Sequence, residues 1–273
     1  MRRAIMISIA GNSEAAFDDS VLSHMERNVY RRKKNSSVLY SYESADELLF
    51  ELRMRSRIIE ESRALDQSGV TFAGFRDSRC NEDYWERDDL GGFRLISGKS
   101  PSEAISDIFT NGQFYTFECA TAVTIILYKS ILDMMGAEKF DSLFSNLILY
   151  DWHQHRNLRI KTERSRSEAV AADIVYFENP DFLPSAPWWR GENAIKLEGG
   201  LYYGHGAGIQ TEDTIIGVLN RTRTPGSTTP AFLSDRLTRP DFAYLYKLQT
   251  DAGSRGGRGR RIVAKIGSIV YVS

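Results

Sequence analysis

The stretch YTFECATAVTIILYKSILDMM, residues 115–135, decides the fold, because it predicts one long helix that is apolar on most of its sides. A helix with so small a polar face must be covered by other elements, which places it in the centre of a domain. Its apolar residues include Cys119, Ala120, Val123, Ile125, Ile126, Leu127, Ile131 and Leu132. We therefore expect the rest of the chain to pack around this helix.

Two more helices are predicted upstream from their start signals. Ser44 followed by Glu47 has the pattern of a capping box, and an apolar stripe at helical spacing then runs to Gly69. A second Ser-x-x-Glu signal opens residues 100–112, with a proline in the first helical position. Between these segments, residues 84–86 and 93–96 flank a Gly-Gly turn and predict a β-hairpin.

The first 40 residues predict a strand and a helix. The apolar run at residues 4–10 follows two arginines, as in a secretory signal peptide, but it is short and alternates as a strand does. We therefore favour an opening β-strand. A helix over residues 21–34 ends in four basic residues, which we interpret as a solvated helix end.

Strands dominate the second half of the chain. They are predicted at residues 147–150, 172–177, 194–197, 201–203, 245–249, 261–266 and 268–272, with one helix over 213–221 and a flexible Gly/Arg-rich loop over 253–261. Helices followed by strands are typical of the α+β class. No long linker divides the chain, so we expect a single compact domain whose central cysteine-bearing helix packs on a mostly antiparallel sheet.

The composition limits the possible partners. The 273 residues are 42% apolar and 26% charged, which allows one large core. A net charge of −1 gives no general attraction to nucleic acid, and no segment reaches the roughly 18 apolar residues of a membrane helix. Two cysteines and four scattered histidines suit neither a disulfide framework nor a structural zinc site. We expect a protein that is synthesised in the cytoplasm.

Cys119 is the strongest candidate for catalysis. It lies near the start of the buried helix, where unpaired N–H groups and the helix dipole favour the reactive thiolate. Free cysteine is also a common small apolar core residue, and position alone leaves that alternative open. Cys80 lies in a polar loop and is interpreted as incidental. Glu118 either faces a cleft beside the thiol or is an exposed glutamate of the first helical turn.

Three short segments hold the other candidate residues. His153 follows a predicted strand and could act as a base, although a surface position fits its spacing better. WWRGEN, residues 188–193, has two interpretations. Tryptophans that exclude water would raise the pKa of Glu192 and suit it to acid–base catalysis. Alternatively, the tryptophans are core residues, and Arg190 pairs with an acid. In YGHG, residues 203–206, the glycines permit a close backbone approach, so His205 is the preferred active-site histidine.

Four strings occur in one chain and in this order: FYTFECAT, ILYDWH, WRGEN and YYGHG, at residues 114–121, 148–153, 189–193 and 202–206. Together with SADELLFELRMRSRII and PSEAISDI, they resemble the protein-glutamine γ-glutamyltransferases of spore-forming bacteria, the spore-coat transglutaminases. The resemblance extends from about residue 42 to residue 249. It implies a compact α+β fold related to the NlpC/P60 and papain-like cysteine enzymes.

The resemblance also implies roles for individual residues. Cys119 matches the nucleophile, and Glu192 matches the catalytic acid and base. His205 matches a supporting histidine, and Glu118 a second glutamate that can assist the thiol. The remaining candidates are expected to contact substrate: Trp152, Trp189, Asp151, His153 and Tyr203.

The implied reaction has two acyl transfers. The Cys119 thiolate attacks a glutamine carboxamide, ammonia leaves, and a lysine amine converts the thioester to an isopeptide bond. Glu192 changes between acid and base, so its pKa should lie nearer neutrality than that of a free glutamate, and N–H groups at the helix start are candidate oxyanion donors. No metal or cofactor is needed. The implied partners are proteins that bear glutamine and lysine, spore-coat proteins among them, and the implied location is the spore coat.

Three segments depart from the resemblance: residues 1–41, the basic stretch 155–167, and everything beyond about residue 250. We therefore expect a catalytic domain over 1–250, variable over 1–41, and an extension over 251–273. The motifs leave open a glutamine deamidase or a cysteine peptidase of the same clan. A non-enzymatic coat or binding protein, using the basic stretches to bind phosphates, is the other alternative. The sequence does not indicate an oligomeric state.

Overall fold

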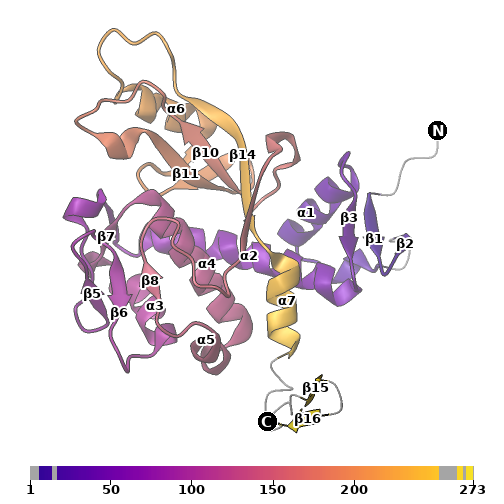
Figure 1. The fold of residues 1–273 in the computed structure, drawn as a ribbon. Helices are drawn as coiled ribbons and strands as arrows, with labels where there is room; N and C mark the ends of the chain where they lie inside the picture. Colours follow the sequence, from indigo (N-terminus) through magenta and orange to yellow (C-terminus); the bar gives the residue numbers. More distant parts are fainter. Residues whose placement is uncertain (1–5, 14–16, 252–262, 267–268, 273) are drawn as a thin grey trace, which may run out of the picture.

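The computed structural model describes residues 6–13, 17–251, 263–266 and 269–272 of the chain. They form a mixed helical and sheet domain, as the α+β prediction requires (Figure 1). The α-helices are α1 His24–Lys34, α2 Ala45–Gln67, α3 Pro101–Thr110, α4 Cys119–Met135, α5 Ala137–Leu143, α6 Glu212–Asn220 and α7 Phe242–Asp251. The strands are β1 Ile7–Ile9, β2 Asn12–Ser13, β3 Tyr40–Tyr42, β4 Thr71–Phe72, β5 Trp85–Arg87, β6 Phe93–Leu95, β7 Thr116–Phe117, β8 Ile148–Leu149, β9 Ile160–Arg164, β10 Ile174–Glu178, β11 Gly191–Lys196, β12 Leu201–Gly204, β13 Gly208–Thr211, β14 Phe232–Pro240, β15 Val263–Ile266 and β16 Ile269–Val272.

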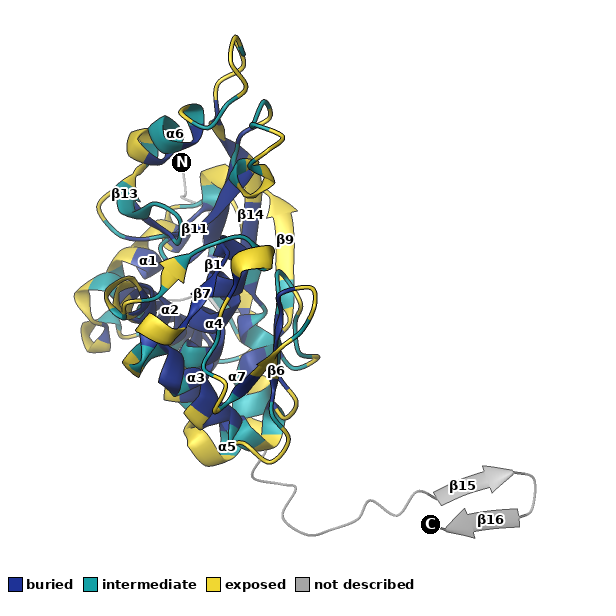
Figure 2. Ribbon diagram, turned by 90° about the vertical axis from the view of Figure 1, so that its left-hand side faces the viewer, coloured by how far each residue is buried: buried dark blue, intermediate teal, exposed yellow. Residues whose placement is uncertain are grey.

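Helix α4 is the buried central helix that the apolar stretch predicts, and its first ten residues are all buried (Figure 2). It begins at Cys119, four residues later than predicted, because Glu118 caps it. The Glu118 carboxylate accepts hydrogen bonds from the backbone N–H groups of Ala120 and Thr121. The preceding residues leave the helix and form β7, which pairs with β4. The cap therefore fixes the cysteine in the first turn of α4.

The main sheet is antiparallel throughout, with the strand order β13-β12-β11-β10-β14-β9. Alternate residues of each strand face opposite sides, as the strand geometry requires. Ile174 and Ile195 pack in the same core as α4, whereas Val175 and Ala194 pack in a second core with α6. A bulge between Val175 and Phe177 shifts the register of β10 against β14. The active site lies on the face of the sheet that is turned toward α4.

A buried ionic network holds the N-terminal part to the sheet domain. The predicted opening strand is β1, with Ile7 fully buried. Lys33 pairs with Glu51, and Arg55 pairs at 2.8 Å with both Glu51 and Asp173. Lys33 belongs to the four-residue basic run, so the prediction of a solvated helix end is wrong for this residue. Its amine turns inward because a buried carboxylate is there to receive it.

Other predictions fare differently along the chain. Residues 245–249 form part of α7 and not the predicted strand, because Asp241 starts a helix by accepting a hydrogen bond from the N–H of Tyr244 at 3.2 Å. Strands β9, β13 and β14 were not predicted. The final hairpin was predicted, and β15 pairs with β16. The predicted loop over 253–261 lies outside the described residues. Within the described part, no helix is long and apolar enough to cross a membrane.

Candidate active site

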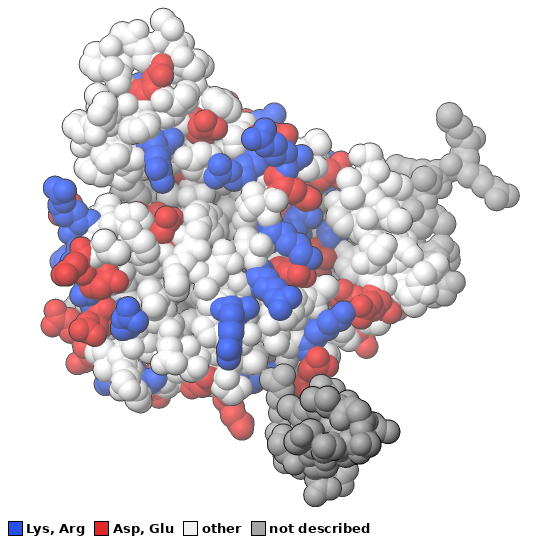
Figure 3. Space-filling view, viewed as in Figure 1, with Lys and Arg blue, Asp and Glu red and all other residues white. Residues whose placement is uncertain are grey.

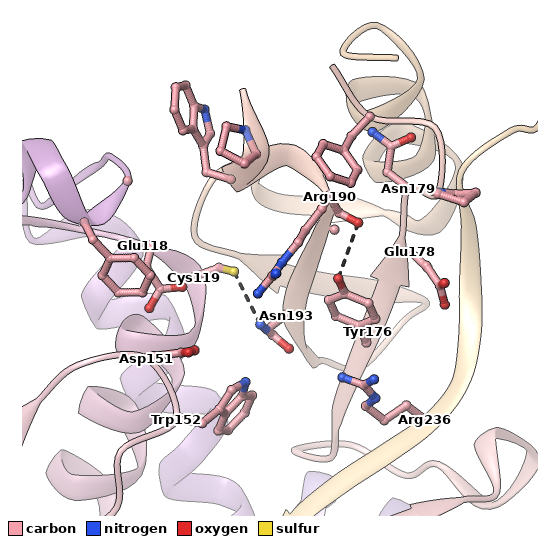
Figure 4. A pocket seen from close by; sticks show the side chains of 17 residues that line it. Glu118, Cys119, Asp151, Trp152, Tyr176, Glu178, Asn179, Arg190, Asn193 and Arg236 are labelled. Carbon is pink, nitrogen blue, oxygen red and sulfur yellow. Dashed lines mark hydrogen bonds between the residues drawn. The ribbon is translucent and has the colours of Figure 1, made fainter. Parts of the chain in front are cut away.

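A cavity of about 770 Å³ lies between the start of α4 and the main sheet (Figure 4). Its helical side is lined by Glu118, Cys119, Asp151 and Trp152. Its sheet side is lined by Tyr176, Glu178, Arg190, Asn193 and Arg236. The fold thus brings the cysteine motif, the DWH segment and the WRGEN segment to one site, as the sequence predicts.

Cys119 lies in the wall of this cavity with 7% of its surface exposed. Asn193 donates a hydrogen bond from Nδ2 to Cys119 Sγ at 3.4 Å. Burial raises the pKa of the thiol well above its usual value, the charges of Glu192 and Glu118 raise it further, and the Asn193 hydrogen bonds lower it. The expected thiolate is therefore not the resting form, because desolvation and the two neighbouring carboxyls outweigh the Asn193 hydrogen bonds. The sulfur has to lose its proton as it reacts.

Glu118 is a buried helix cap. Its two carboxylate oxygens accept from the N–H groups of Ala120 and Thr121, both at 2.6 Å, and from the Thr121 hydroxyl at 2.7 Å. Burial raises the pKa of this carboxyl, although the three hydrogen bonds oppose the rise. Of the two alternatives for Glu118, the structure has the one in which it faces a cleft beside the thiol, and the exposed first-turn glutamate is not found. The Ala120 and Thr121 N–H groups are also occupied, so they are not open to a developing oxyanion.

Glu192 is 1% exposed and has one oxygen without a partner. Its Oε1 accepts from the Gly206 N–H at 3.3 Å, while Oε2 has no hydrogen-bond partner among the described residues. Burial raises the pKa of Glu192 to about 8, with the Glu118 charge adding and the Gly206 and His205 N–H groups opposing. No hydrogen bond joins Glu192 to Cys119 in the described residues. The carboxyl is held toward the turn at residues 204–206.

The two glycines of that turn make room for Glu192. A Cβ atom on Gly206 would lie 3.1 Å from Glu192 Oε2 and 3.2 Å from the Trp189 ring. A Cβ on Gly204 would lie 3.0 Å from Glu192 Cγ. All three distances are tighter than ordinary contacts, so the close approach predicted from the Gly-His-Gly string is found. The carboxyl of Glu192 is the group that lies against the backbone of Gly204 and Gly206.

The His205 ring is held in one neutral tautomer. Its Nε2 faces the Thr71 carbonyl oxygen at 3.3 Å, so Nε2 carries the hydrogen and donates. Nδ1 then accepts from the Tyr203 hydroxyl at 3.0 Å, and the ring stacks on Phe117 with centroids 4.8 Å apart. Burial lowers the pKa of His205 to about 4. Both ring nitrogens are occupied, which leaves neither free to take a proton from Cys119.

The DWH segment places its three residues differently. Asp151 and Trp152 line the cavity on the side of α4 (Figure 4). The N–H of Asp151 donates to the Thr121 hydroxyl at 3.0 Å, which fixes the segment to the first turn of α4. His153 is exposed, as its spacing suggested, and is not among the residues that line the cavity.

The two tryptophans of the WWRGEN segment lie on different sides of the wall. Trp189 packs against Phe72, with ring centroids 5.2 Å apart, and touches the position of Gly206. It therefore lies behind Glu192 and does not line the cavity. Trp188 does line the cavity and is 43% exposed. The sequence singled out Trp189 for substrate contact, but Trp188 is the one at the opening.

Several cavity residues were not among the predicted site residues, and four of them are polar or charged groups on the sheet side: Asn193, Tyr176, Arg190 and Arg236. Asn193 and Arg190 belong to WRGEN, so their proximity to Glu192 in the chain was the available signal. Tyr176 donates from its hydroxyl to the Arg190 carbonyl oxygen at 3.3 Å, and the absence of a side chain at Gly191 makes space for that hydroxyl. Arg236 lies on β14, an unpredicted strand, and nothing in its sequence neighbourhood indicated a site.

Comparison with known proteins identifies the family. A family model described as protein-glutamine gamma-glutamyltransferase matches residues 6–249. The chain belongs to this family. The match starts well before residue 42, so the N-terminal part that the sequence resemblance excluded is included in the transglutaminase family model.

Individual transglutaminases agree with this assignment. Protein-glutamine gamma-glutamyltransferases of Halalkalibacterium halodurans and Bacillus mycoides are each 43% identical to the chain. The first aligns over 86% of this chain and 82% of the relative, and the second over 84% and 85%. A solved transglutaminase from Geobacillus stearothermophilus, described as lacking its C-terminal extension, is 46% identical with a TM-score of 0.71 and covers 74% of this chain and 96% of its own. These matches do not favour a peptidase, a deamidase or a non-enzymatic protein.

Proposed function

We propose that this transglutaminase joins glutamine and lysine side chains of proteins through a thioester on Cys119. The observation that carries the proposal is a buried thiol at the start of α4, in the wall of a cavity, with a side-chain amide on the sulfur and two buried carboxyls nearby. Glu192 and Glu118 are close enough to Cys119 for their charges to raise its pKa. Such a cluster provides a nucleophile and a proton carrier in one site.

Glu192 is the proposed proton carrier in both steps. With a pKa raised to about 8, its carboxyl is mostly protonated at neutral pH. In the first step Glu192 protonates the departing amide nitrogen and takes the thiol proton, so that ammonia leaves and the carboxyl is neutral again. In the second step the neutral lysine amine attacks the thioester and its proton returns, through Glu192, to the Cys119 sulfur. Direct transfer requires the carboxyl to turn from Gly206 toward the sulfur when substrate binds.

The other buried polar groups position the reacting ones. Glu118 fixes the first turn of α4 by occupying its N–H groups, which leaves Glu192 as the carboxyl with an oxygen to spare. His205, locked by Tyr203 and Thr71, holds the turn whose N–H groups face Glu192. Asn193 stabilises the thiolate as it forms, because it donates to the sulfur.

The aromatic and acidic residues of the DWH segment are proposed to receive the lysine. Asp151 and Trp152 line the cavity on one side of Cys119, and a carboxylate beside an indole suits a cationic, extended amine. Trp152 also limits the access of water, which would hydrolyse the thioester and turn cross-linking into glutamine deamidation. Trp189 packs on Phe72 and beside the position of Gly206, so it is proposed to keep water away from the side of Glu192. The exposed His153 is proposed to touch the protein that carries the lysine.

The setting of the reaction is proposed from family resemblance. The relatives reported above come from bacilli and related bacteria, and we propose spore-coat proteins as substrates, with synthesis in the cytoplasm and a final location on the spore. We also propose that catalysis resides in residues 1–250 and that residues 251–273 are an extension. A chain that ends at residue 250 should retain amine incorporation if this division is correct.

Incorporation of a labelled amine into a glutamine-rich protein tests the function. We expect Cys119→Ala to abolish incorporation and Cys80→Ala to leave it intact, because Cys80 is half-buried, outside the cavity, and has a pKa raised to about 11 by burial. Equal activity of Cys119→Ala and the unmodified chain contradicts the proposal. Ammonia release without amine incorporation would assign a deamidase instead, and chain cleavage would assign a peptidase.

A further inference from the structure

Four side chains form a row across the sheet face that looks toward α4. Asn193 of β11 is paired with Tyr176 of β10, and Arg236 of β14 is paired with Arg164 of β9. The guanidinium carbon of Arg236 lies 4.8 Å from the centroid of the Tyr176 ring, which joins the two pairs across the bulge. The row starts at the Cys119 sulfur, which Asn193 contacts, and ends at the outer strand of the sheet.

The strand register supports this placement. Directly paired residues of neighbouring strands point to the same face. Two positions along the same strands, the Thr162 and Thr238 hydroxyls are hydrogen-bonded at 2.9 Å, so Arg164 and Arg236 share their face. Lys161, an odd number of positions from Arg164, faces the other side and pairs with Asp241 at 2.9 Å. The row and its reverse side can therefore be tested separately.

Two guanidinium groups in the cavity have no acidic partner in the described residues. Neither Arg190 nor Arg236 forms an ion pair there, whereas Arg239, three residues along β14, contacts Glu163 and Asp173. Arg190 extends into the cavity beside Cys119 and Asn193, and Arg236 points in from β14 (Figure 4). Arg164 continues this positive charge to the exposed edge strand. Basic side chains also form a band over this face of the molecule beside β14 (Figure 3).

The acidic and basic side chains of the cavity lie mainly on opposite sides of Cys119. Glu118 and Asp151 line it on the side of α4, and the two arginines line it on the sheet side. The sheet side also holds Glu178, two residues from Tyr176, but two cations outnumber this one carboxylate. A ligand that bears a carboxylate is therefore favoured along the sheet, and a cation on the opposite side.

We propose that Arg236, with Arg190 next to it in the cavity, binds an acidic residue a few positions from the reactive glutamine of the donor protein, and that Arg164 extends the site toward a second acid. The enzyme would then select glutamines in acidic segments. This inference rests on the proposed transglutaminase function. An arginine binds a carboxylate through two parallel hydrogen bonds, and a site that is partly shielded from water strengthens them. The donor segment lies in extended form over the row, with its glutamine at Cys119 and its acid over Tyr176 and Arg236.

The sheet geometry sets the distance between the glutamine and the acid. Neighbouring strands are about 4.8 Å apart, so Asn193 and Arg236, two strands apart, are separated by about 10 Å. An extended peptide advances about 3.3 Å per residue, which corresponds to about three residues. The acid is therefore expected at the third position from the glutamine, on one of its two sides. Arg164, one strand farther out, matches a second acid one or two residues beyond.

Peptide binding tests the inference apart from catalysis. Peptides with one central glutamine carry Asp or Asn at the third position before or after it, and are titrated into the Cys119→Ala protein. We expect the Asp peptide of one series to bind about tenfold more tightly than its Asn partner in low salt. Arg236→Gln should reduce this ratio to near one, and Arg236→Lys should keep part of it. Lys161→Gln is the matched control on the reverse side and should keep all of it.

The same ratio is then measured in amine incorporation with the intact cysteine. We expect kcat/KM to favour the same Asp peptide by a similar factor and this preference to fall as salt rises. Arg236→Gln should remove the preference by lowering kcat/KM for the Asp peptide more than for the Asn peptide. Equal binding of Asp and Asn peptides in both series overturns the inference, as does a preference that Arg236→Gln and Arg164→Gln both leave intact. Amine incorporation without any preference for the Asp peptide would overturn this inference but not the transglutaminase function. A binding preference without amine incorporation would support the inference and count against the transglutaminase function.

Discussion

Asn193 Nδ2 donates to Cys119 Sγ at 3.4 Å, and this contact joins the sheet to the helix that carries the nucleophile. The hydrogen bond lowers the pKa of a thiol that burial raises. Asn193→Ala should therefore slow alkylation of Cys119 by iodoacetamide and lower kcat/KM by about 10- to 100-fold, since a hydrogen bond to a charged group contributes about 1.5–3 kcal/mol. An alkylation rate equal to that of the unmodified chain across pH 6–9 would contradict this role.

The raised pKa of Glu192 makes the stability of the protein depend on pH. The folded carboxyl keeps its proton up to about pH 8, whereas the unfolded one loses it near pH 4.5. Between these values the folded state holds the extra proton, so rising pH destabilises it by up to about 1.4 kcal/mol per unit. Glu192→Gln lacks this group, so its free energy of unfolding relative to the unmodified chain should increase from pH 5 to pH 8 and then level off. Urea unfolding at several pH values measures this, with the exposed Glu163→Gln as control; a difference that is constant with pH would disprove the shift.

Water exclusion is expected to depend on Trp152, one of the two tryptophans that line the cavity. Trp152→Ala should raise the ratio of glutamine deamidation to cross-linking several-fold, because it opens the thioester to water. Trp189→Ala should also raise the ratio, since it removes the ring behind Gly206 and Glu192, and it should lower the total rate as well. Parallel assays of ammonia release and amine incorporation give the ratio. If neither change alters it, the tryptophans do not exclude water.

The buried ionic network should be essential for stability. Asp173→Asn removes a fully buried carboxylate that Arg55 contacts at 2.8 Å, and leaves the buried guanidinium short of a partner. Breaking such a pair typically costs about 3–5 kcal/mol. Urea unfolding at pH 7 should show a loss of this size. Glu60→Gln, which breaks the exposed Arg57–Glu60 pair, should cost less than about 1 kcal/mol, and equal losses would contradict the assignment.

The elements with an apolar period or a start signal could be predicted from the sequence. The buried helix, the Ser44 and Ser100 helix starts and the hairpin at residues 85–95 are all present. The helix boundary at Cys119 was missed because the buried Glu118 acts as a cap, and cap recognition from sequence favours serine, threonine, aspartate and asparagine. Strand β9 is largely charged, and β14 mixes charged, polar and apolar residues. The two strands are held together by pairing with each other, which is information carried by the tertiary structure.

The part of the candidate site whose residues belong to the sequence motifs could be predicted. Cys119, Glu118, Asp151 and Trp152 line one cavity, and Glu192 lies beside it. Arg236 could not be predicted, because it lies on β14, which is distant in sequence from every motif. Only the pairing of β14 within the sheet brings this residue to the cavity. The roles of the site residues, the relation to the NlpC/P60 enzymes and the division at residue 250 stay predictions.

The locked imidazole of His205 affects how the enzyme should respond to acidity. Because the pKa of this ring is lowered to about 4, it stays largely uncharged from neutral pH down to about pH 5. Cysteine enzymes that depend on an imidazolium lose their ion pair when that ring is neutralised. Among the groups around Cys119, the one that ionises nearest to neutrality is a carboxylic acid, Glu192, so moderate acidification leaves it in its proton-donating form. An inflection of the rate near pH 8 would thus be the signature of a buried acid, and a mildly acidic medium would leave the first chemical step unimpaired.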